Sequence, residues 1–200
     1  PTTCCQLHNK YISIKKLMDN YSFMNGNKKA SSIAKNIKLL ILDVDGVLTD
    51  GGIYFDDNGT EHKKFDSQDG CGIKLLELSG VEVAIITARS TKSVAHRLNT
   101  LGIKNYYHGI KDKGVALKEL SDKLSIDLNE SAFVGDDVID LPAMSKVALP
   151  IAVANAHSFV KENALMVTEK AGGSGAVREV CDFLLKSQNK YDDLMQSFLK

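Results

Sequence analysis

Short apolar runs alternate with longer stretches of helical periodicity along this chain of 200 residues. The first run, residues 39–42, reads Leu-Leu-Ile-Leu, and an uninterrupted apolar run of this kind is typical of a strand buried in a parallel sheet. Further strands are predicted at residues 81–86, 105–108, 131–137, 151–154 and 166–168, and helices at residues 71–79, 91–101, 111–124, 156–163 and 176–186. This alternation predicts an α/β fold, a three-layer α/β/α sandwich around a mostly parallel, Rossmann-like sheet.

Two kinds of segment interrupt this alternation. Between the first strand and the first helix, the turn sequence Asp-Asp-Asn-Gly at residues 56–59 predicts a β-hairpin over residues 53–65. Because the hairpin leaves from the end of the first strand, it can cover a site there. Residues 1–35 are expected to form a leader, either partly disordered or a short amphipathic helix. The domain is expected to span residues 36–188, followed by a tail at residues 189–200.

Acidic residues stand where two of the predicted strands end. Asp43 and Asp45 follow the first apolar run, and Asp136, Asp137 and Asp140 follow the fourth strand. In open α/β sheets ligands bind at the carboxyl ends of strands, so these side chains are expected to meet. Carboxylates this close repel one another unless a cation or a shared proton intervenes, which favours an oxygen-rich Mg²⁺ site. A loop that merely favours Asp and Gly would explain the first pair alone, but not both clusters.

A hydroxyl group and several cations occupy comparable positions. Thr87 ends the second strand and Arg89 follows it, while Lys111 and Lys113 open a later helix. A lysine at a helix start can bind phosphate, but spacing alone does not choose between these two. For Arg97, helical spacing alone favours a solvated face.

The segment before the first helix is open to two interpretations. Ser67 or Asp69 can serve as the N-cap of that helix. The free N–H groups of a helix start also suit an anion, and this start returns toward the Asp43 end of the sheet. A purely structural cap and a ligand contact are equally compatible with Asp69.

The composition of the chain limits the kinds of partner that it is expected to bind. The chain has 25 basic and 25 acidic residues and no apolar run of membrane-spanning length, which argues against a nucleic-acid or membrane partner but not against a small anion. Cys4, Cys5, Cys71 and Cys181 show no metal-ligand spacing, so they are expected to be reduced thiols in a cytoplasmic protein.

Four of these features together resemble the haloacid dehalogenase superfamily of phosphohydrolases. They are the Asp-x-Asp-Gly-Val-Leu sequence at residues 43–48, Thr87 at a strand end, Lys113 at a helix start, and Gly-Asp-Asp-x-x-Asp at residues 135–140. They occur in the expected order on the expected elements, and the resemblance covers about residues 37–187.

Longer segments are similar to the 3-deoxy-D-manno-octulosonate 8-phosphate phosphatase family. They lie at residues 43–51, 65–73, 85–89 and 171–179. The resemblance implies no separate cap domain, a hairpin that assembles a homotetramer, and hydrolysis of a small phosphorylated sugar acid in lipopolysaccharide precursor biosynthesis. It also implies that a neighbour's glycine-rich segment lies near the site, with Gly172, Gly173, Gly175 and Arg178. The chain departs from the family pattern at Ala88, at residues 66–68 and at Lys74, and the last two bear on the choice of sugar.

The resemblance implies a role for each site residue. Asp43 would be the nucleophile that forms an aspartyl-phosphate, and Asp45 the general acid and base. Mg²⁺ would be held by the Asp43 carboxylate, the Asp45 main-chain carbonyl and Asp136, with Asp137 and Asp140 orienting this shell. Thr87 and Lys113 would bind the phosphoryl oxygens. The residues expected to meet substrate are Asp45, Asp66, Ser67, Gln68, Asp69, Gly70, Lys74, Arg89, Arg97 and Lys113.

Three other functions fit the same sequence less well. One is a phosphatase for a related, nine-carbon sialic-type sugar acid phosphate. A second is a non-catalytic assembly module, although such a module tends to lose one of the motif residues that are intact here. Phosphomutase action is the third, and the lack of a cap domain to retain an intermediate argues against it.

Overall fold

A computed structural model of the protein describes residues 28–199. The helix or disordered segment predicted for the first part of the leader lies outside these residues, as do Cys4 and Cys5. Within the described range, Cys71 is an exposed free thiol and Cys181 a buried one. None of the described helices combines the length and apolar character needed to cross a lipid bilayer.

The centre of the protein is a parallel sheet of six strands in the order β5-β4-β1-β6-β7-β8. The strands are β1 (Leu39–Leu42), β4 (Glu82–Ile86), β5 (Asn105–Tyr107), β6 (Ser131–Gly135), β7 (Leu149–Ala152) and β8 (Met166–Val167). All four residues of β1 are fully buried because β4 and β6 flank this strand and helices cover both faces. The uninterrupted apolar run therefore has the physical origin that the sequence predicts.

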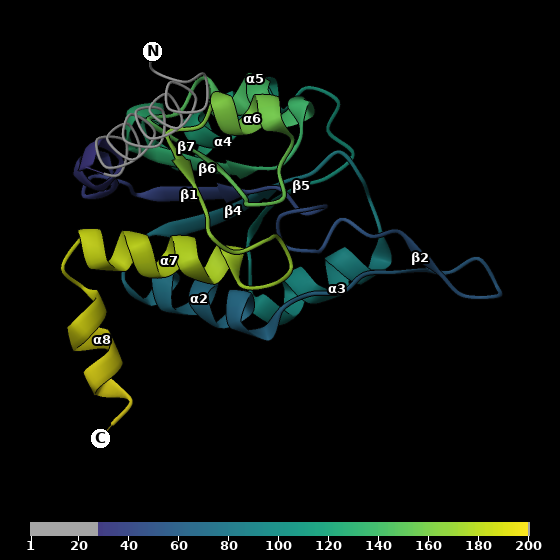
Figure 1. The fold of residues 1–200 in the computed structure, drawn as a ribbon, viewed down its shortest axis with the longest axis horizontal. Helices are drawn as coiled ribbons and strands as arrows, with labels where there is room; N and C mark the ends of the chain where they lie inside the picture. Colours follow the sequence, from purple (N-terminus) through teal and green to yellow (C-terminus); the bar gives the residue numbers. More distant parts are fainter. Residues whose placement is uncertain (1–27, 200) are drawn as a thin grey trace, which may run out of the picture.

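Helices cover both faces of the sheet, which confirms the predicted α/β/α sandwich (Figure 1). One face carries α2 (Ser67–Leu78), α3 (Lys92–Leu101) and α7 (Ala176–Ser187). The other carries α4 (Lys113–Leu124), α5 (Leu141–Met144) and α6 (Ser158–Glu162). Two short 3-10 helices, η1 (Leu128–Glu130) and η2 (Val138–Asp140), flank β6.

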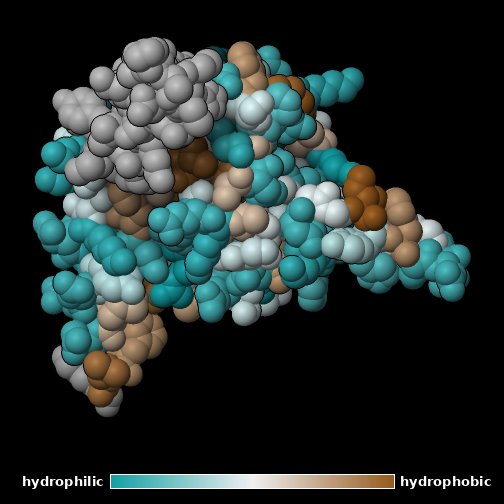
Figure 2. All heavy atoms as spheres, in the orientation of Figure 1, coloured by the Kyte–Doolittle hydropathy of each residue, from teal (hydrophilic) through white to brown (hydrophobic). Residues whose placement is uncertain are grey.

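The predicted hairpin is present as β2 (Tyr54–Phe55) and β3 (Glu61–His62), paired antiparallel. The Asp56 carboxylate accepts hydrogen bonds from the amides of Asn58 and Thr60, which closes the turn. The hairpin projects from the body of the protein (Figure 1), and Figure 2 shows apolar atoms along it. Ile53 and Phe55 on this arm are 56% and 63% exposed.

Both ends of the described chain carry helices. Residues 28–34 are helical, and Ala30 and Ala34 are fully buried in the core. At the other end, the segment expected as a tail contains α8 (Tyr191–Ser197). The boundary predicted at residue 35 therefore lies at the end of a helix that packs into the core. The boundary predicted at residue 189 lies between α7 and α8.

Candidate active site

Three carboxylates from two segments of the chain meet at the carboxyl edge of the sheet. Asp43 follows β1 and Asp136 follows β6, and these strands are neighbours with Leu42 opposite Val134. Asp140 joins them from η2, and one oxygen of each carboxylate lies within 4.8 Å of the others. The structure thus brings together three of the five acidic residues that the sequence places at these strand ends, and Asp45 and Asp137 are not among them.

Lys113 is the cation at the centre of this cluster. Its side chain is 1% exposed, and its ammonium lies 2.7 Å from Asp43 Oδ1 and 2.6 Å from Asp140 Oδ1. The residue opens α4, where the Asp112 carboxylate caps the helix by accepting from the amides of Gly114 and Val115. Lys111 is exposed, so the structure resolves the choice that spacing left open.

The electrostatics of the cluster favour a divalent cation. Burial, reinforced by the charges of Asp43 and Asp140, raises the pKa of Asp136 to about 8. Burial likewise raises the pKa of Asp43, although the Lys113 ammonium opposes the shift. The raised pKa values mean that the cluster tends to hold protons in the absence of a further cation, and with all three carboxylates ionised the net charge beside the Lys113 ammonium is two minus. Oxygen donors with this charge fit a hard divalent metal ion.

Gly46 is required by close packing at the turn after β1. Its φ is +89°, and a Cβ there would lie 2.1 Å from Asp136 Oδ2. Any other residue would therefore strain the backbone and displace a carboxylate of the cluster.

The glycine-rich segment lies against the loop of residues 43–50, called the catalytic loop below. A Cβ on Gly172 would lie 1.7 Å from the carbonyl oxygen of Gly46, and the Gly173 amide donates to the Val47 carbonyl at 3.0 Å. Within one chain this segment therefore packs on its own catalytic loop. Contact with a neighbour's site stays a prediction.

A buried hydroxyl group organises the catalytic loop from within. Thr49 is 1% exposed, donates to the Val44 carbonyl at 3.2 Å and accepts from the amides of Gly46 and Gly51. Sequence reasoning missed this residue because nothing in the hydrophobic pattern distinguishes a buried loop hydroxyl group from an exposed one.

Asp45 lies outside the group of three carboxylates and makes a separate ion pair. Its carboxylate bonds the Lys63 ammonium, which also lies 2.9 Å from Glu61 Oε1. Glu61 in turn accepts from Arg89 at 2.8 Å. The role of Lys63 was not predicted. Side chains of a strand alternate between its two faces, so residues 61 and 63 lie on the same face of the hairpin, and a pair between them could have been predicted.

Comparison with known proteins agrees with this geometry. Residues 107–180 match the haloacid dehalogenase-like hydrolase family. The 3-deoxy-D-manno-octulosonate 8-phosphate phosphatase KdsC of Escherichia coli K12 is 53% identical over 160 residues, which are 80% of this chain and 85% of that protein. This chain belongs to the KdsC family of haloacid dehalogenase-like phosphatases. It is accordingly an enzyme, a phosphoric monoester hydrolase.

Solved structures of KdsC proteins share the fold. The enzyme from Yersinia pestis is 48% identical, with a TM-score of 0.81 over 82% of this chain and 89% of that one. The enzyme from Moraxella catarrhalis, in complex with magnesium, phosphate and KDO, is 43% identical, with a TM-score of 0.82 over 84% of this chain and 97% of that one.

Among the remaining residues expected at the KdsC-type site, Asp137 and Asp140 act differently from each other. Asp137 caps η2 and its side chain is turned to the amide of Val138. Asp140 accepts from the amides of Asp136 and Asp137 at 2.9 and 3.3 Å while also facing Lys113. Asp140 therefore holds the backbone of this loop and offers an oxygen to the cluster, while its role in orienting a metal shell stays a prediction.

Thr87 lies one residue beyond β4 and is 2% exposed. Its hydroxyl oxygen accepts from the Arg89 amide at 3.3 Å. Since β4 is the neighbour of β1, Thr87 reaches the same edge of the sheet as Asp43.

The start of α2 corrects the expected cap. Asp66, not Ser67 or Asp69, is the N-cap, and its carboxylate accepts from the amides of Gln68 and Asp69. Asp69 is 1% exposed and accepts from the Arg178 amide at 2.8 Å at the start of α7. Asp69 thus links α2 to α7. Its negative charge lies at the N-terminal end of α7, where the helix dipole stabilises a carboxylate.

The other expected substrate residues are distributed around α2. Ser67 and Gln68 are exposed and line a cavity of about 400 Å³ with Lys170 and Arg178. Buried Gly70 lies so close to Arg97 that a Cβ would be 2.4 Å from the guanidinium.

Arg97 and Lys74 contact residues outside the group of three carboxylates. The Arg97 guanidinium donates to the Asp66 carbonyl at 3.2 Å and lies 5.9 Å from the centre of the Phe65 ring. The Lys74 ammonium lies beside Gly102, the C-cap of α3. Within one chain, neither side chain reaches the cluster, so their contact with substrate stays a prediction.

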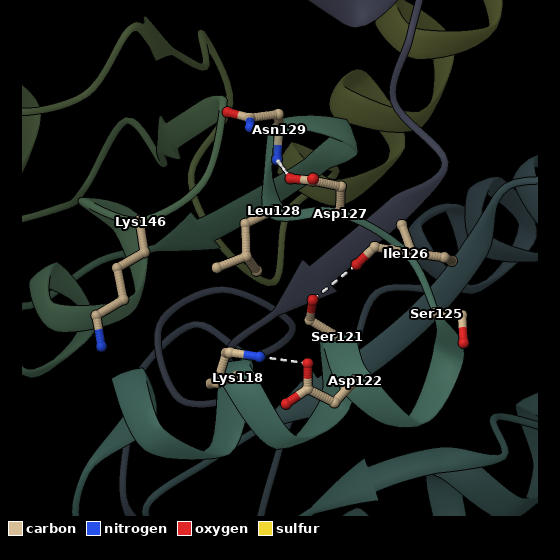
Figure 3. Close-up of a pocket in the computed structure, with 9 residues that line it drawn as sticks. All are labelled: Lys118, Ser121, Asp122, Ser125, Ile126, Asp127, Leu128, Asn129 and Lys146. Atoms are coloured by element: carbon tan, nitrogen blue, oxygen red, sulfur yellow. Dashed lines mark hydrogen bonds and ion pairs between the residues drawn. The ribbon is translucent and has the colours of Figure 1, made fainter.

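A cavity of about 710 Å³ lies at the opposite end of α4 from Lys113 (Figure 3). It is lined by Lys118, Asp122, Asp127 and Lys146, among others. Lys118 pairs with Asp122, and the Asp127 carboxylate accepts from the Asn129 amide. Lys146 donates to the Gly114 carbonyl at 3.2 Å, and Asp122 and Asp127 are the only carboxylates among the described residues of the lining, so the cavity has no group of three there like that at the sheet edge.

Proposed function

We propose that the protein hydrolyses 3-deoxy-D-manno-octulosonate 8-phosphate to the free sugar acid and phosphate. The observation that carries this proposal is the Lys113 ammonium, buried between Asp43 and Asp140 and beside Asp136. The KdsC relatives support the choice of sugar acid, since one of the similar structures contains magnesium, phosphate and KDO. The place in lipopolysaccharide precursor biosynthesis stays a prediction.

Mg²⁺ is the metal that we assign to the cluster. The Asp43 and Asp136 carboxylates and the Asp45 main-chain carbonyl would hold it, with an Asp140 oxygen close by. When bound, it neutralises carboxylate charge that would otherwise repel the phosphoryl group.

The first chemical step belongs to Asp43. Its carboxylate oxygen forms a bond to phosphorus while the bond from phosphorus to the sugar oxygen breaks, which leaves an aspartyl-phosphate. Asp45 gives its proton to the departing sugar oxygen. Thr87 and Lys113 bind the non-bridging phosphoryl oxygens. Positioning and charge neutralisation are the main sources of rate in such transfers, which can exceed the unaided reaction by up to ~10²¹-fold.

The second step regenerates the enzyme. Asp45 takes a proton from water as the water oxygen attacks phosphorus, and the bond between Asp43 and phosphorus breaks. Phosphate then leaves, and Asp45 is protonated for the next cycle. The two carboxylates need different surroundings for these roles, and only Asp43 lies in the group of three.

The expected homotetramer is part of this proposal. Ile53, Tyr54 and Phe55 are exposed on the hairpin, and apolar side chains on a projecting arm favour an interface between copies. Light scattering would measure the assembly, and a monomer would contradict it. The cytoplasmic location stays a prediction.

A substrate panel with released phosphate as the readout tests the function. We expect turnover of 3-deoxy-D-manno-octulosonate 8-phosphate with Mg²⁺ and none after chelation. Faster turnover of a nine-carbon sialic-type sugar acid phosphate would change the assigned substrate to that compound. Turnover of no sugar phosphate would contradict the proposed function as a whole.

A further inference from the structure

The Lys63 side chain is a buried cation that pairs with Asp45, and the proposed reaction assigns no role to it. Its side chain is 0% exposed, whereas that of the next residue, Lys64, is 61% exposed. A buried ammonium is costly unless it is paired. Lys63 is paired twice, with the carboxylates of Asp45 and Glu61.

These pairs join three separate segments. Asp45 belongs to the catalytic loop, residues 61 and 63 to the hairpin, and Arg89 to the loop after β4. Arg89 holds the second oxygen of Glu61 at 2.8 Å, so the chain of charges runs Asp45, Lys63, Glu61, Arg89 and is neutral overall. A contact of Lys63 therefore fixes the hairpin relative to the catalytic loop.

Asp45 needs such a partner because of its position. Its side chain is 27% exposed and its carboxylate is not among the three that converge near Lys113. A carboxylate on a partly exposed loop samples several rotamers, and a general acid must lie within hydrogen-bond reach of the oxygen that it protonates.

We propose that Lys63 is a positioning residue: by bonding Oδ1 of Asp45 it fixes that carboxylate so that the other oxygen, Oδ2, can carry the proton, and the hairpin thereby takes part in the acid–base step. This inference rests on the proposed function, in which Asp45 is the acid and base. Lys63 acts through Asp45 and does not itself bond the reacting atoms.

The test compares Lys63→Met with Lys64→Met, a matched loss of charge at the adjacent position. It uses two substrates, the sugar acid 8-phosphate and p-nitrophenyl phosphate, whose phenolate leaves with little need of a proton. The ratio kcat/KM is measured because it reports the steps up to phosphoenzyme formation.

We expect Lys63→Met to lower kcat/KM for the sugar phosphate by about 10²-fold, within the range for loss of general acid catalysis. For the aryl phosphate the loss should stay within about threefold, as should any effect of Lys64→Met on either substrate. Lys63→Arg should restore most of the activity because a guanidinium also binds a carboxylate. Unfolding midpoints of the variants serve as the folding control.

If the enzyme does not hydrolyse aryl phosphates, a double-mutant cycle with Asp45→Asn provides the test instead. If Lys63 acts through Asp45, Lys63→Met in the Asp45→Asn background should lower kcat/KM by less than about threefold. Equal losses for both substrates, additive losses in the cycle, or identical behaviour of the two lysine variants would overturn the inference while leaving the proposed function intact. A wild-type protein that hydrolyses no sugar phosphate would contradict both.

Discussion

Helix α4 contributes one lysine to an ion pair at its start and another to an ion pair toward its end, and the two pairs have opposite surroundings. At its start, Lys113 is 1% exposed and lies between two carboxylates that are 5% and 0% exposed. Toward its end, Lys118 and Asp122 form an ion pair whose side chains are 62% and 63% exposed. Both sites pair a lysine of α4 with aspartate, so the residue types are shared, but Asp43 and Asp140 come from other segments that bury the first pair, whereas Asp122 lies on the helix itself.

Burial changes what each charge can do. Exposed pairs are screened by water and add little to stability, whereas a buried charge without a partner costs several kcal/mol. At the buried end water does not screen the charges, so their free energy depends strongly on whether a cation or a phosphoryl group is bound beside them. The exposed end has no such requirement.

Asp43→Asn should have the largest effect of all. The amide removes the nucleophile, so we expect the turnover of sugar phosphate to fall by roughly 10⁴-fold or more. Phosphate release and trapping of a phosphoenzyme measure the loss. Asp122→Asn at the exposed end is the control and should keep wild-type turnover, while near-normal activity of Asp43→Asn would refute the nucleophile.

Lys113→Met should lower stability more than any change at the exposed end. It leaves the Asp43 and Asp140 carboxylates buried without their cation, which costs about 3–5 kcal/mol of unfolding free energy. Urea unfolding in metal-free buffer measures it. A loss below about 1 kcal/mol would show that water reaches the cluster and that the contrast in burial is smaller than described.

Mg²⁺ should stabilise only the buried end. At about 100 times its Kd, we expect it to raise the unfolding free energy by about 2.7 kcal/mol. Asp136→Asn should abolish this gain, and Asp127→Asn in the exposed cavity should retain it. A gain that survives Asp136→Asn would place the ion elsewhere.

Asp69 extends the comparison to a buried carboxylate outside the cluster. Burial raises its pKa from 3.8 to about 6, so the folded protein binds this proton more tightly than the unfolded chain. The stability that it contributes is complete below pH 3.8 and is lost as the pH rises through about 6.

Asp69→Asn keeps an acceptor for the Arg178 amide and removes this pH dependence. Relative to wild type, we expect the variant to gain roughly 2–3 kcal/mol of unfolding free energy between pH 4 and pH 8. Urea unfolding across this range measures the difference. A constant difference between the two proteins would mean that Asp69 has an ordinary pKa.

Lys118→Met should have the smallest effect. An exposed pair four residues apart on a helix contributes about 0.3–0.5 kcal/mol, and salt screens it. Thermal unfolding at low and high salt measures this, with turnover unchanged. A loss above about 1 kcal/mol would show that the exposed end also depends on its charges.

The sequence is sufficient for the sheet and for much of the cluster, because the carboxyl ends of parallel strands meet at one edge. Asp43, Asp136 and Thr87 follow strands whose apolar runs are visible in the chain, and the structure brings them to that edge. Strand limits differ by one or two residues, as in β7, which begins at Leu149.

The rest depends on contacts between segments far apart in the chain. The oxygen that Asp140 offers depends on the 3-10 turn of η2, and the burial of Lys63 depends on how the hairpin lies over the catalytic loop. The cap of α2 at Asp66 depends on a local choice among neighbouring polar residues. The helix α8 was missed because its seven residues carry too few apolar positions for a clear period.

The contact of the glycine-rich segment with the catalytic loop has a consequence for biosynthesis. Asp43 lies early in the chain, but the backbone of Gly172 that packs on its loop is translated 129 residues later. The nascent chain therefore contains the residues of β1 and of the turn after it long before the segment that packs on this turn has been made. The contact that encloses this turn can therefore be made only after all six strands of the sheet have been translated.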